Sequence, residues 1–290
     1  MRALVTGGTG FIGTHLVKRL NEAGHDVISI DSEISEKHAT EQRYVWSDIC
    51  NYTHLTKLRN IIEGIDVVYH LAAKKDLQAS HNNVISYHNT NVVGSLNLLE
   101  LCREVGVKRL VFASSSAVYG ESDLDSYSET SPTEPLSPYG LQKLTVEKYC
   151  KLYSEYYGLD TVCLRYFNVF GPGTKEGVVP ILQKQHKNNK FLTIFGSGEN
   201  ERDFVHVDDV INATILAGGY NSEHNGDVFN VAYGECTSIN DIALAICGTG
   251  GKIDRLPKKI EAFSVRGNIS KIKENLEWKP TIHVLDWLSN

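Results

Sequence analysis

The sequence lacks long hydrophobic runs and has no excess of basic residues. No apolar run approaches the roughly 18 residues that a membrane-spanning helix needs. The first residues, MRALVTGG, already have the pattern of a strand. We therefore expect no membrane segment, no signal peptide ahead of the fold and a cytoplasmic location. The net charge of −6 provides no basic surface for nucleic acid or an anionic membrane.

The sequence also lacks the motifs of metal and disulfide sites. Its 6 cysteines are widely scattered without a CxxC pair, and its 11 histidines include no HExxH. Neither a zinc site nor a disulfide framework is indicated. We therefore expect reduced cysteines and no bound metal.

What the chain does have is a regular alternation of apolar and amphipathic segments over its first 165 residues. The expected strands are 3–7, 26–31, 66–73, 109–115 and 161–167. Between them, the segments with apolar residues at helical spacing are 14–24, 91–106 and 139–158. Several of the strands are apolar on both faces, as parallel strands covered by helices should be. This pattern predicts an α/β fold with a Rossmann-type doubly wound parallel sheet.

After about residue 166 the alternation becomes less regular, which predicts a smaller C-terminal α/β lobe. We expect a first domain of residues 1–165, with 208–232 returning to its sheet. The second lobe is expected to consist of residues 166–207 and 233–290.

The segment VTGGTGFIG, directly after the first strand, is the strongest local signal. Gly7, Gly10 and Gly13 are spaced GxxGxxG ahead of a helix, where backbone N–H groups and the helix N-terminus can bind a pyrophosphate. Asp31 ends the second strand, and a carboxylate there accepts both ribose hydroxyls and repels a 2′-phosphate, which favours NAD over NADP. Asp48 either holds an adenine amino group or caps a helix, and both interpretations stay open.

The segment SPYGLQK places Tyr139 and Lys143 four positions apart. On a helix the two side chains share a face, so the ammonium can lie near the phenol. A nearby cation favours the phenolate and lowers a pKa that is normally near 10, which makes tyrosine a usable base near neutral pH. With 14 tyrosines in the chain, about one such pair is expected by chance, so the pair needs support from its surroundings.

That support comes from further motifs, which follow one another in a specific order. They are HLAA (70–73), an NxxG segment that opens a helix at Asn91, FASSSAVYG (112–120), RYFNVFGPG (165–173), TIFGSGENERDFVHVDDV (193–210) and FNVAYG (229–234). With these motifs the chain resembles the extended short-chain dehydrogenase/reductase family, in particular its nucleotide-sugar epimerases and dehydratases. The resemblance runs from Met1 to about Pro280.

The resemblance implies NAD as the cofactor, bound by the first domain, with Phe167 beside the nicotinamide. The residues that it places at the cofactor are Gly7, Gly10, Phe11, Ile12, Gly13, Asp31, Asp48, Ile49, Leu71, Ala72, Ala73, Lys75, Asn91, Tyr139, Lys143 and Phe167.

The resemblance also implies the chemistry. Ser115 would share the proton of the substrate hydroxyl, Tyr139 would remove it, and Lys143 would also hold the nicotinamide ribose. Family members that eliminate water resemble TDE where this chain has Ser115, Ser116 and Ala117, so it lacks the acid and base of a dehydratase. We therefore expect a 4-epimerase, in which C4 of a sugar is oxidised to a ketone and reduced from the other face.

A UDP-sugar is the implied substrate, held by the second lobe. The residues placed at it are Ser115, Ser116, Asn168, Val178, Val179, Thr193, Phe195, Arg202, Lys258, Glu261 and Val265. Arg202 would clamp a phosphate, although an ordinary salt bridge with Asp203 or Glu201 is the alternative.

Near the C-terminus the chain departs from the family pattern. Lys258 and Glu261 stand where relatives have an arginine and an acid, and Arg255 or Arg266 could complete the phosphate clamp instead. Val265 occupies the position beside the C2 substituent of the sugar, where a valine leaves room for an N-acetyl group. This predicts that UDP-GlcNAc and UDP-GalNAc are accepted besides or above UDP-glucose and UDP-galactose.

In the family, the helices that begin near Asn91 and Tyr139 pair across a two-fold axis, which implies a homodimer through a four-helix bundle. The apolar residues on these helices are Leu96, Leu99, Tyr149, Leu152, Tyr153 and Tyr156, although such stripes could simply be core. The competing functions are a 4-ketoreductase or 2-epimerase, a 4,6-dehydratase, and a non-catalytic dinucleotide-sensing regulator.

Overall fold

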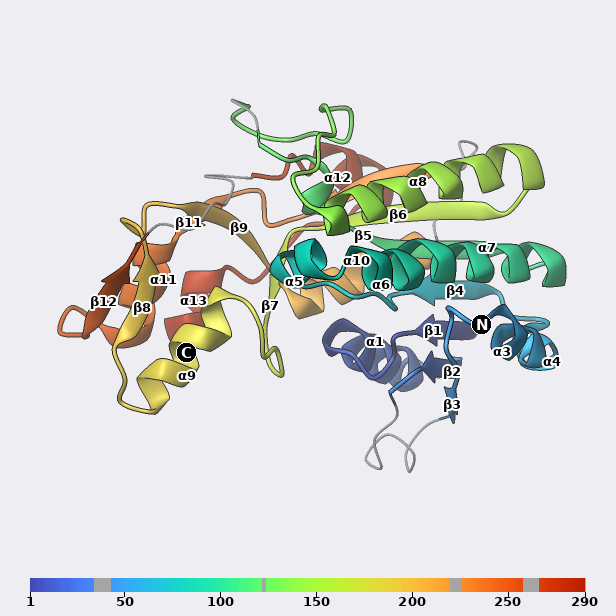
Figure 1. The fold of residues 1–290 in the computed structure, drawn as a ribbon, viewed down its shortest axis with the longest axis horizontal. Coiled ribbons are helices and arrows are strands. Elements are labelled where there is room, and N and C mark those ends of the chain that lie inside the picture. The colour runs from blue at the N-terminus through green and yellow to red at the C-terminus, as the bar shows by residue number, and fades with distance from the viewer. Residues whose placement is uncertain (34–42, 122–123, 220–225, 258–265, 290) are drawn as a thin grey trace. The chain divides into compact units, whose positions relative to one another are not determined.

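The computed structural model describes residues 1–33, 43–121, 124–219, 226–257 and 266–289 (Figure 1). The chain divides into two compact units. The first consists of Met1–Gly120, Pro132–Arg165 and Ile211–Phe229, and the second of Glu121–Ser131, Tyr166–Val210 and Asn230–Asn290.

The first unit is organised by a seven-stranded sheet. Its strands are β1 (Arg2–Thr6), β2 (Asp26–Asp31), β3 (Arg43–Trp46), β4 (Val67–His70), β5 (Arg109–Ser115), β6 (Asp160–Tyr166) and β10 (Asp227–Val231). The strand order is β10-β6-β5-β4-β1-β2-β3, and the pairs that β1 forms with β2 and β4 are parallel. The order therefore reverses between β1 and β4, which places a ligand crevice at the carboxyl ends of these strands. The predicted α/β fold class is confirmed.

Helices and tight turns connect these strands. They are α1 (Phe11–Glu22), α3 (Tyr52–Lys57), α4 (Arg59–Ile62), α5 (Leu77–Asn82), α6 (Val84–His88), the π-helical turn η1 (Asn89–Val93), α7 (Gly94–Val105), the 3-10 turn η2 (Ser116–Val118), α8 (Pro138–Tyr157) and α10 (Val207–Gly219). The start of α10 belongs to the second unit and the rest to the first. Figure 1 shows α7 and α8 running alongside the strands β4, β5 and β6.

Local sequence explains why α8 begins and ends where it does. The Ser137 hydroxyl accepts the N–H of Gly140 at 3.1 Å, and Pro138 occupies the first helical position. At the other end, Gly158 adopts a left-handed φ of 69° and stops the helix. The orientation of the SPYGLQK segment is therefore fixed by its own first residues.

One large part of the core of the first unit lies between the sheet and α7 and α8. Fully or almost fully buried members are Leu4, Val68, Leu110, Phe112, Leu98, Leu101, Cys102, Val146, Cys150 and Cys163. Because α7 and α8 pack on strands that are themselves apolar, the side chains facing the core need no polar partners.

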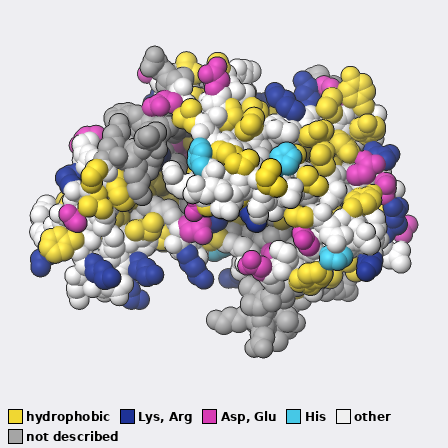
Figure 2. Space-filling view, in the orientation of Figure 1, with side chains coloured by type: hydrophobic (Ala, Val, Ile, Leu, Met, Phe, Trp, Pro, Cys, Tyr) yellow, Lys and Arg dark blue, Asp and Glu magenta, His cyan; other side chains and the backbone are white. Residues whose placement is uncertain are grey.

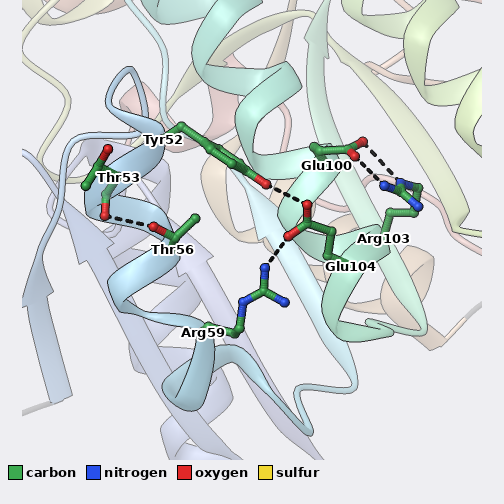
Figure 3. Close-up of polar contacts among 7 residues, drawn as sticks. All are labelled: Tyr52, Thr53, Thr56, Arg59, Glu100, Arg103 and Glu104. Atoms are coloured by element: carbon green, nitrogen blue, oxygen red, sulfur yellow. Dashed lines mark hydrogen bonds and ion pairs between the residues drawn. The ribbon is translucent and has the colours of Figure 1, made fainter.

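A polar network on the surface connects α3 and α4 to α7 (Figure 3). Tyr52 donates a hydrogen bond to Glu104 at 2.9 Å, and Arg59 pairs with the same carboxylate. One turn earlier on α7, Glu100 accepts a hydrogen bond from Tyr153 of α8 at 2.9 Å. Such exposed contacts contribute little stability each, but they occupy this side of α7.

The structure differs from the expected elements in several respects. The predicted strand 66–73 ends at His70, and Asn91 lies inside η1 rather than opening a helix. The strand β3 and the short helices α3, α4, α5 and α6 are not predicted from the sequence.

In its described residues, the second unit contains two small sheets and four helices of its own. The sheets join β11 (Cys236–Ser238), β9 (Glu201–His206) and β7 (Asn168–Phe170), and β12 (Ile253–Leu256) with β8 (Leu192–Phe195). The helices are α9 (Val178–Lys187), α11 (Ile239–Cys247), α12 (Ser270–Leu276) and α13 (Val284–Ser289). Its separate core includes Phe170, Val179, Leu182, Ile194, Ile242 and Val284.

Across the described ranges, none of the helices is long and apolar enough to cross a membrane. In the same ranges, no group of three or more His, Cys, Asp or Glu side chains is arranged to hold a metal ion.

Candidate active site

The glycine turn after β1 can only be built from residues without a side chain. Gly7 has a φ of 71°, and a Cβ on it would lie 2.7 Å from the backbone nitrogen of Ala72. A Cβ on Gly13 would lie 2.1 Å from the carbonyl oxygen of Gly7. The turn is thus pressed against the end of β4 on one side and against the first turn of α1 on the other. This close approach explains the glycine spacing without reference to a ligand.

The same turn leaves the start of α1 open. Gly10 precedes the helix without a side-chain cap, and the first turn contains no acidic residue. The first backbone N–H groups of a helix have no partner within the helix, so those of Phe11, Ile12 and Gly13 can bind an anion. These residues fit the pyrophosphate of a dinucleotide.

Asp31 at the end of β2 lies against the glycine turn. One carboxylate oxygen accepts the backbone N–H of Thr9 at 3.1 Å and its hydroxyl at 2.7 Å, and the other accepts the N–H of Glu33 at 3.1 Å. Thr9, which the sequence analysis missed, therefore orients the carboxylate expected to bind the ribose. Only a contact across 22 residues reveals it.

The alternative that Asp48 caps a helix is wrong. Asp48 accepts the N–H of Cys50 at 2.9 Å in a turn, whereas Asn51 caps α3 by accepting from His54. Ile49 is 6% exposed and lies so close to α7 that a Cβ on Gly94 would contact it at 2.8 Å. Ile49 thus contributes to the core, and its place at the cofactor stays a prediction.

A chain of buried hydrogen bonds lies beneath the end of β4. The N–H of Ala72 donates to the Thr6 hydroxyl at 3.2 Å, and that hydroxyl lies 2.7 Å from Nδ1 of His70. Nε2 of His70 lies 2.8 Å from the hydroxyl of Ser95, which itself donates to the carbonyl of Asn91. Because Ser95 has a single proton, His70 must donate from Nε2 and accept at Nδ1. Burial also lowers the pKa of His70 to about 3, so its imidazole is neutral.

Asn91 connects this chain to the catalytic helix. Its side chain accepts the N–H of Lys74 at 2.8 Å and donates to the carbonyl of Lys74 and to the side chain of Gln142 on α8, each at 2.9 Å. Asn91 is 1% exposed. Its hydrogen bonds to the backbone of Lys74 hold the segment after β4 in place. This segment includes Leu71, Ala72 and Ala73. Lys75, two residues beyond Ala73, is exposed.

Ser115, Tyr139 and Lys143 come together at the carboxyl end of β5. Ser115 ends the strand, accepts the N–H of Ala117 at 3.2 Å and hydrogen-bonds Tyr139. Nζ of Lys143 lies 5.8 Å from the centre of the Tyr139 ring and donates to the carbonyl of Ala113 at 2.7 Å. Ser116 follows directly as the first residue of η2. A half-buried hydroxyl, a buried phenol and a buried ammonium thus share one site.

Burial sets the titration of this group. It raises the pKa of Tyr139 to about 12, against the opposing effect of the hydrogen bond with Ser115. It lowers the pKa of Lys143 to about 8, while the carboxylate of Glu147 acts to raise it. The expected lowering of the Tyr139 pKa by Lys143 stays a prediction, because in this structure the ammonium is bound to the Ala113 carbonyl.

Gly140, inside the SPYGLQK segment, is a site residue that the sequence analysis missed. A Cβ there would lie 2.3 Å from the carbonyl oxygen of Ala117 in η2. The absent side chain lets α8 approach the turn that follows Ser115. Gly140, between Tyr139 and Lys143, therefore affects how closely Ser115 and Tyr139 can approach each other.

Apart from Ser115 and Ser116, the residues expected at the substrate belong to the second unit, as does Phe167, which is expected beside the nicotinamide. Phe167 is 4% exposed, and Asn168 donates to the carbonyl of Asp203 at 2.9 Å. The first two residues of α9 are Val178, half-buried, and Val179, which is 1% exposed and belongs to the core. The buried position of Val179 means that its backbone, not its side chain, is available to a ligand.

Two further predicted residues lie on β8. The hydroxyl of Thr193 accepts a hydrogen bond from Gln185 at 3.0 Å, and its N–H donates to the same side chain. Phe195, at the end of the strand, is 37% exposed. A partly exposed aromatic ring at a strand end can stack on a planar base.

Arg202 and Asp203 are neighbours on β9 but have different surroundings. The guanidinium of Arg202 donates to the carbonyl of Glu201 at 2.7 Å. Asp203 is fully buried and accepts the N–H groups of Tyr233, Gly234 and Gly267 at 2.7, 2.9 and 3.1 Å. Successive strand residues point to opposite faces, so the side chains of Arg202 and Asp203 lie on different faces of β9. The Asp203 carboxylate binds the backbone N–H groups of these loops.

The remaining predicted residues, Lys258, Glu261 and Val265, lie outside the described residues. Of the two alternatives for the phosphate clamp, Arg255 donates to the carbonyl of Ser197 and to Asn240, while Arg266 is exposed.

Comparison with known proteins agrees with these motifs. A sequence model of the "NAD dependent epimerase/dehydratase family" matches residues 3–232. The chain belongs to this family. It is 36% identical over 306 residues to a putative UDP-glucose 4-epimerase of Methanocaldococcus jannaschii, an alignment that covers 99% of this chain and 98% of that protein. The family resemblance expected from the sequence is confirmed.

Solved structures of family members have the same fold. UDP-glucose 4-epimerase of Thermotoga maritima, solved with UDP-glucose, has a TM-score of 0.91 at 32% identity and covers 100% of this chain and 96% of its own. UDP-N-acetylglucosamine 4-epimerase of Methanobrevibacter ruminantium, in complex with UDP-N-acetylmuramic acid, has a TM-score of 0.89 at 31% identity, with 99% and 96% covered.

Proposed function

We propose that this protein is an NAD-dependent nucleotide-sugar 4-epimerase, an isomerase that inverts C4 of a UDP-hexose through a 4-keto intermediate. The observation that carries the proposal is the group formed by Ser115 with the buried side chains of Tyr139 and Lys143. Next to it, positions 116 and 117 provide a serine and an alanine instead of carboxyl groups. A 4,6-dehydratase needs an acid and a base in addition to the tyrosine. The chain therefore has the residues for alcohol oxidation and lacks those for elimination.

The chemistry follows from the positions of the three side chains. Tyr139 accepts the proton of the C4 hydroxyl and returns a proton when the ketone is reduced. Ser115, already hydrogen-bonded to Tyr139, shares the same hydroxyl and keeps it oriented. Lys143 adds a positive charge near the phenol and holds the nicotinamide ribose. NAD⁺, when bound, supplies the hydride acceptor at C4 and afterwards the hydride donor.

The first unit has the residues for the cofactor. The glycine turn and the open start of α1 suit a pyrophosphate, and Asp31, oriented by Thr9, suits the two hydroxyls of an unphosphorylated ribose. We assign the expected first domain, residues 1–165 with 208–232, to NAD binding. We assign residues 166–207 and 233–290 to the UDP-sugar, with Arg202 and Asn168 at the diphosphate and Phe195 at the base.

A homodimer through α7 and α8 is part of this proposal. Leu99 is fully buried and belongs to the core, which removes it from the expected interface. Leu152, Tyr156 and Tyr157 of α8 are 43%, 74% and 57% exposed, and Figure 2 shows hydrophobic side chains gathered over this part of the first unit. Burying these rings in a partner would remove a large apolar area from water.

Light scattering after size-exclusion chromatography tests the dimer. The wild type should have twice the mass of one chain, and Tyr156→Glu should yield monomers because a carboxylate cannot be buried in an apolar interface. A control change outside the helix pair, Tyr52→Phe on α3, should leave the dimer intact. A monomeric wild type would contradict the dimer without affecting the proposed reaction.

The reaction is tested by offering UDP-glucose, UDP-galactose, UDP-GlcNAc and UDP-GalNAc separately and resolving the products by proton NMR. An epimerase forms the C4 epimer without consuming reduced cofactor, whereas a 4-ketoreductase consumes it in proportion to product. Conversion of the acetylated pair would support the role given to Val265, and conversion of only the non-acetylated pair would contradict it. Absence of conversion with all four sugars would overturn the proposed function.

A further inference from the structure

A buried carboxylate lies one helical turn beyond Lys143, and the proposed reaction does not use it. Glu147 is 4% exposed and accepts hydrogen bonds from three donors. The guanidinium of Arg165 grips it with two of its nitrogens, Nε at 2.9 Å from one oxygen and Nη2 at 2.7 Å from the other. The hydroxyl of Ser114 donates to the first oxygen. This is a bidentate ion pair in which one carboxylate oxygen also accepts a further hydrogen bond.

The partners of Glu147 come from the elements that carry the catalytic group. Ser114 directly precedes Ser115 on β5, and Arg165 lies near the end of β6. Lys143, four residues before Glu147 on α8, donates to the carbonyl of Ala113 on the same strand β5. Helix α8 is therefore attached to the last residues before Ser115 twice, once through Lys143 and once through Glu147.

Burying an ion pair in the core costs desolvation free energy. The position of the Glu147–Arg165 pair therefore needs an explanation. Removing two ions from water costs several kcal/mol each, and well-packed apolar residues often stabilise a fold as well or better. An apolar pair could not, however, orient the hydroxyl of Ser114 or supply a negative charge near Lys143. Both of these act on the residues that carry out the reaction.

The charges around Lys143 come from each element that surrounds it. On α8 it is near Tyr139, Cys150 and Glu147, on β4 near the neutral His70, and on β6 near Cys163, while Arg165 of β6 pairs with Glu147. Among them, the ionised carboxylate of Glu147 is the strongest influence that favours the ammonium, whose pKa burial lowers to about 8. Loss of this anion would lower the pKa of the buried Lys143 ammonium further.

We propose that Glu147 is a positioning residue for the epimerase reaction: with Arg165 it fixes the end of β5 against α8, and its charge keeps Lys143 a cation beside Tyr139. Glu147 touches neither substrate nor cofactor and acts through Ser114 and Lys143. The inference rests on the proposed function for its effect on turnover, but its effect on Lys143 exists without substrate.

A second buried ion pair provides a matched control. Arg109 and Asp160 pair at the opposite, amino ends of the same two strands, with side chains 7% and 19% exposed. Asp160→Asn breaks a buried pair between β5 and β6 just as Glu147→Gln does, but far along the strands from Lys143. A loss of activity in both Glu147→Gln and Asp160→Asn would indicate an effect on folding. A loss in Glu147→Gln alone would indicate an effect on the active site.

The experiment compares Glu147→Gln, the double variant Glu147→Gln/Arg165→Met and Asp160→Asn. The double variant removes both charges and so avoids an unpaired buried arginine, which keeps the test valid if the single variant does not fold. We expect kcat to fall at least about 10-fold in both Glu147 variants, with KM changed less than about twofold, and kcat of Asp160→Asn to stay at the wild-type value. The acid limb of the kcat–pH profile should move to higher pH, because a neutral Lys143 no longer favours the Tyr139 phenolate.

A measurement without substrate separates this inference from the proposed function. The pKa of Lys143 is followed by NMR of ε-carbon-labelled lysine, with the signal assigned through Lys143→Arg. It should fall in both Glu147 variants and stay unchanged in Asp160→Asn. A double variant with wild-type kcat, pH profile and Lys143 titration would overturn the inference, as would an equal loss of kcat in Asp160→Asn. Failure of the wild type to convert any UDP-sugar would refute the proposed function, while the Lys143 titration would still decide the role of Glu147.

Discussion

The two ends of β5 and β6 have the same kind of interaction but differ in what surrounds it. At the amino ends, Arg109 pairs with Asp160 and also donates to the carbonyl of Ala217 in α10 at 3.1 Å. At the carboxyl ends, Arg165 pairs with Glu147 beside Ser114 and Lys143. The first pair connects only structural elements, namely β5, β6 and α10. The second joins framework to reacting groups, as expected where parallel strands end. Residue chemistry alone thus does not distinguish a structural ion pair from one that serves the site.

The largest expected contrast between the two ends comes from Tyr139→Phe. Removing the hydroxyl takes away the base, so turnover should fall by at least about 100-fold. The fold and NAD binding should persist, because the ring remains. Conversion of the accepted UDP-sugar and the NAD released on denaturation check this. Tyr156→Phe, on the exposed part of the same helix, should leave both unchanged. Residual turnover near the wild-type rate in Tyr139→Phe would assign the base to another group.

A smaller effect is expected when the two glycines at the ends of α8 are compared. Gly140→Ala forces a Cβ within 2.3 Å of the Ala117 carbonyl and should displace Ser115 from Tyr139. We expect kcat to fall about 10- to 100-fold, since small misplacements of reacting groups have effects of that size.

The control is Gly158→Ala, where a Cβ would meet nothing within 4 Å but the φ is 69°. It should lower the free energy of unfolding by about 1 to 2 kcal/mol and leave kcat unchanged. Steady-state kinetics and urea unfolding separate the two effects. Equal kcat values for both variants would show that the contact between α8 and η2 is irrelevant to the site.

At the amino ends, Asp160→Asn should affect stability alone. It leaves Arg109 charged and nearly buried, which should lower the free energy of unfolding by about 3 to 5 kcal/mol. Turnover at a temperature where the variant is folded should match the wild type. Urea unfolding followed by circular dichroism, with activity measured on the same samples, provides the check. A stability loss below about 1 kcal/mol would mean that this pair is no more important than a surface ion pair.

The smallest expected effect is on stability and comes from the neutral His70 at the end of β4. Its pKa is about 3 in the fold against 6.5 in the unfolded chain. The unfolded state therefore binds more protons between these values, so stability falls as pH falls, by up to about 1.4 kcal/mol per pH unit. His70→Asn should be less stable at pH 7 but should lose stability less steeply from pH 6.5 to 4.5. Parallel unfolding curves for the two proteins over this range would show that His70 does not titrate as its burial implies.

The sequence was sufficient for features that depend on local spacing. The glycine turn and the Tyr139–Lys143 pair each lie within a short segment of the sequence. Their geometry therefore follows from the regular geometry of the strand, turn or helix that contains them. Thr9 and the Glu147–Arg165 pair escaped prediction, since each makes its decisive contact across 18 residues or more. Nothing in the local pattern separates Glu147 from the exposed glutamates of an amphipathic helix. The role of Asn91 was also missed in part, because its contacts depend on the helical path through η1.

The π-helical turn η1 has a consequence for how this chain can change over evolution. A π turn holds one more residue than an α turn, so α6 and α7 are out of step by about 100° relative to an uninterrupted helix. Asn91 lies in this turn and contacts both Lys74 and Gln142. A single-residue deletion next to Asn91 would rotate the helix on one side of it by about 100° relative to the other side, and we expect it to disturb these contacts. This segment should therefore tolerate substitutions far better than changes in its length.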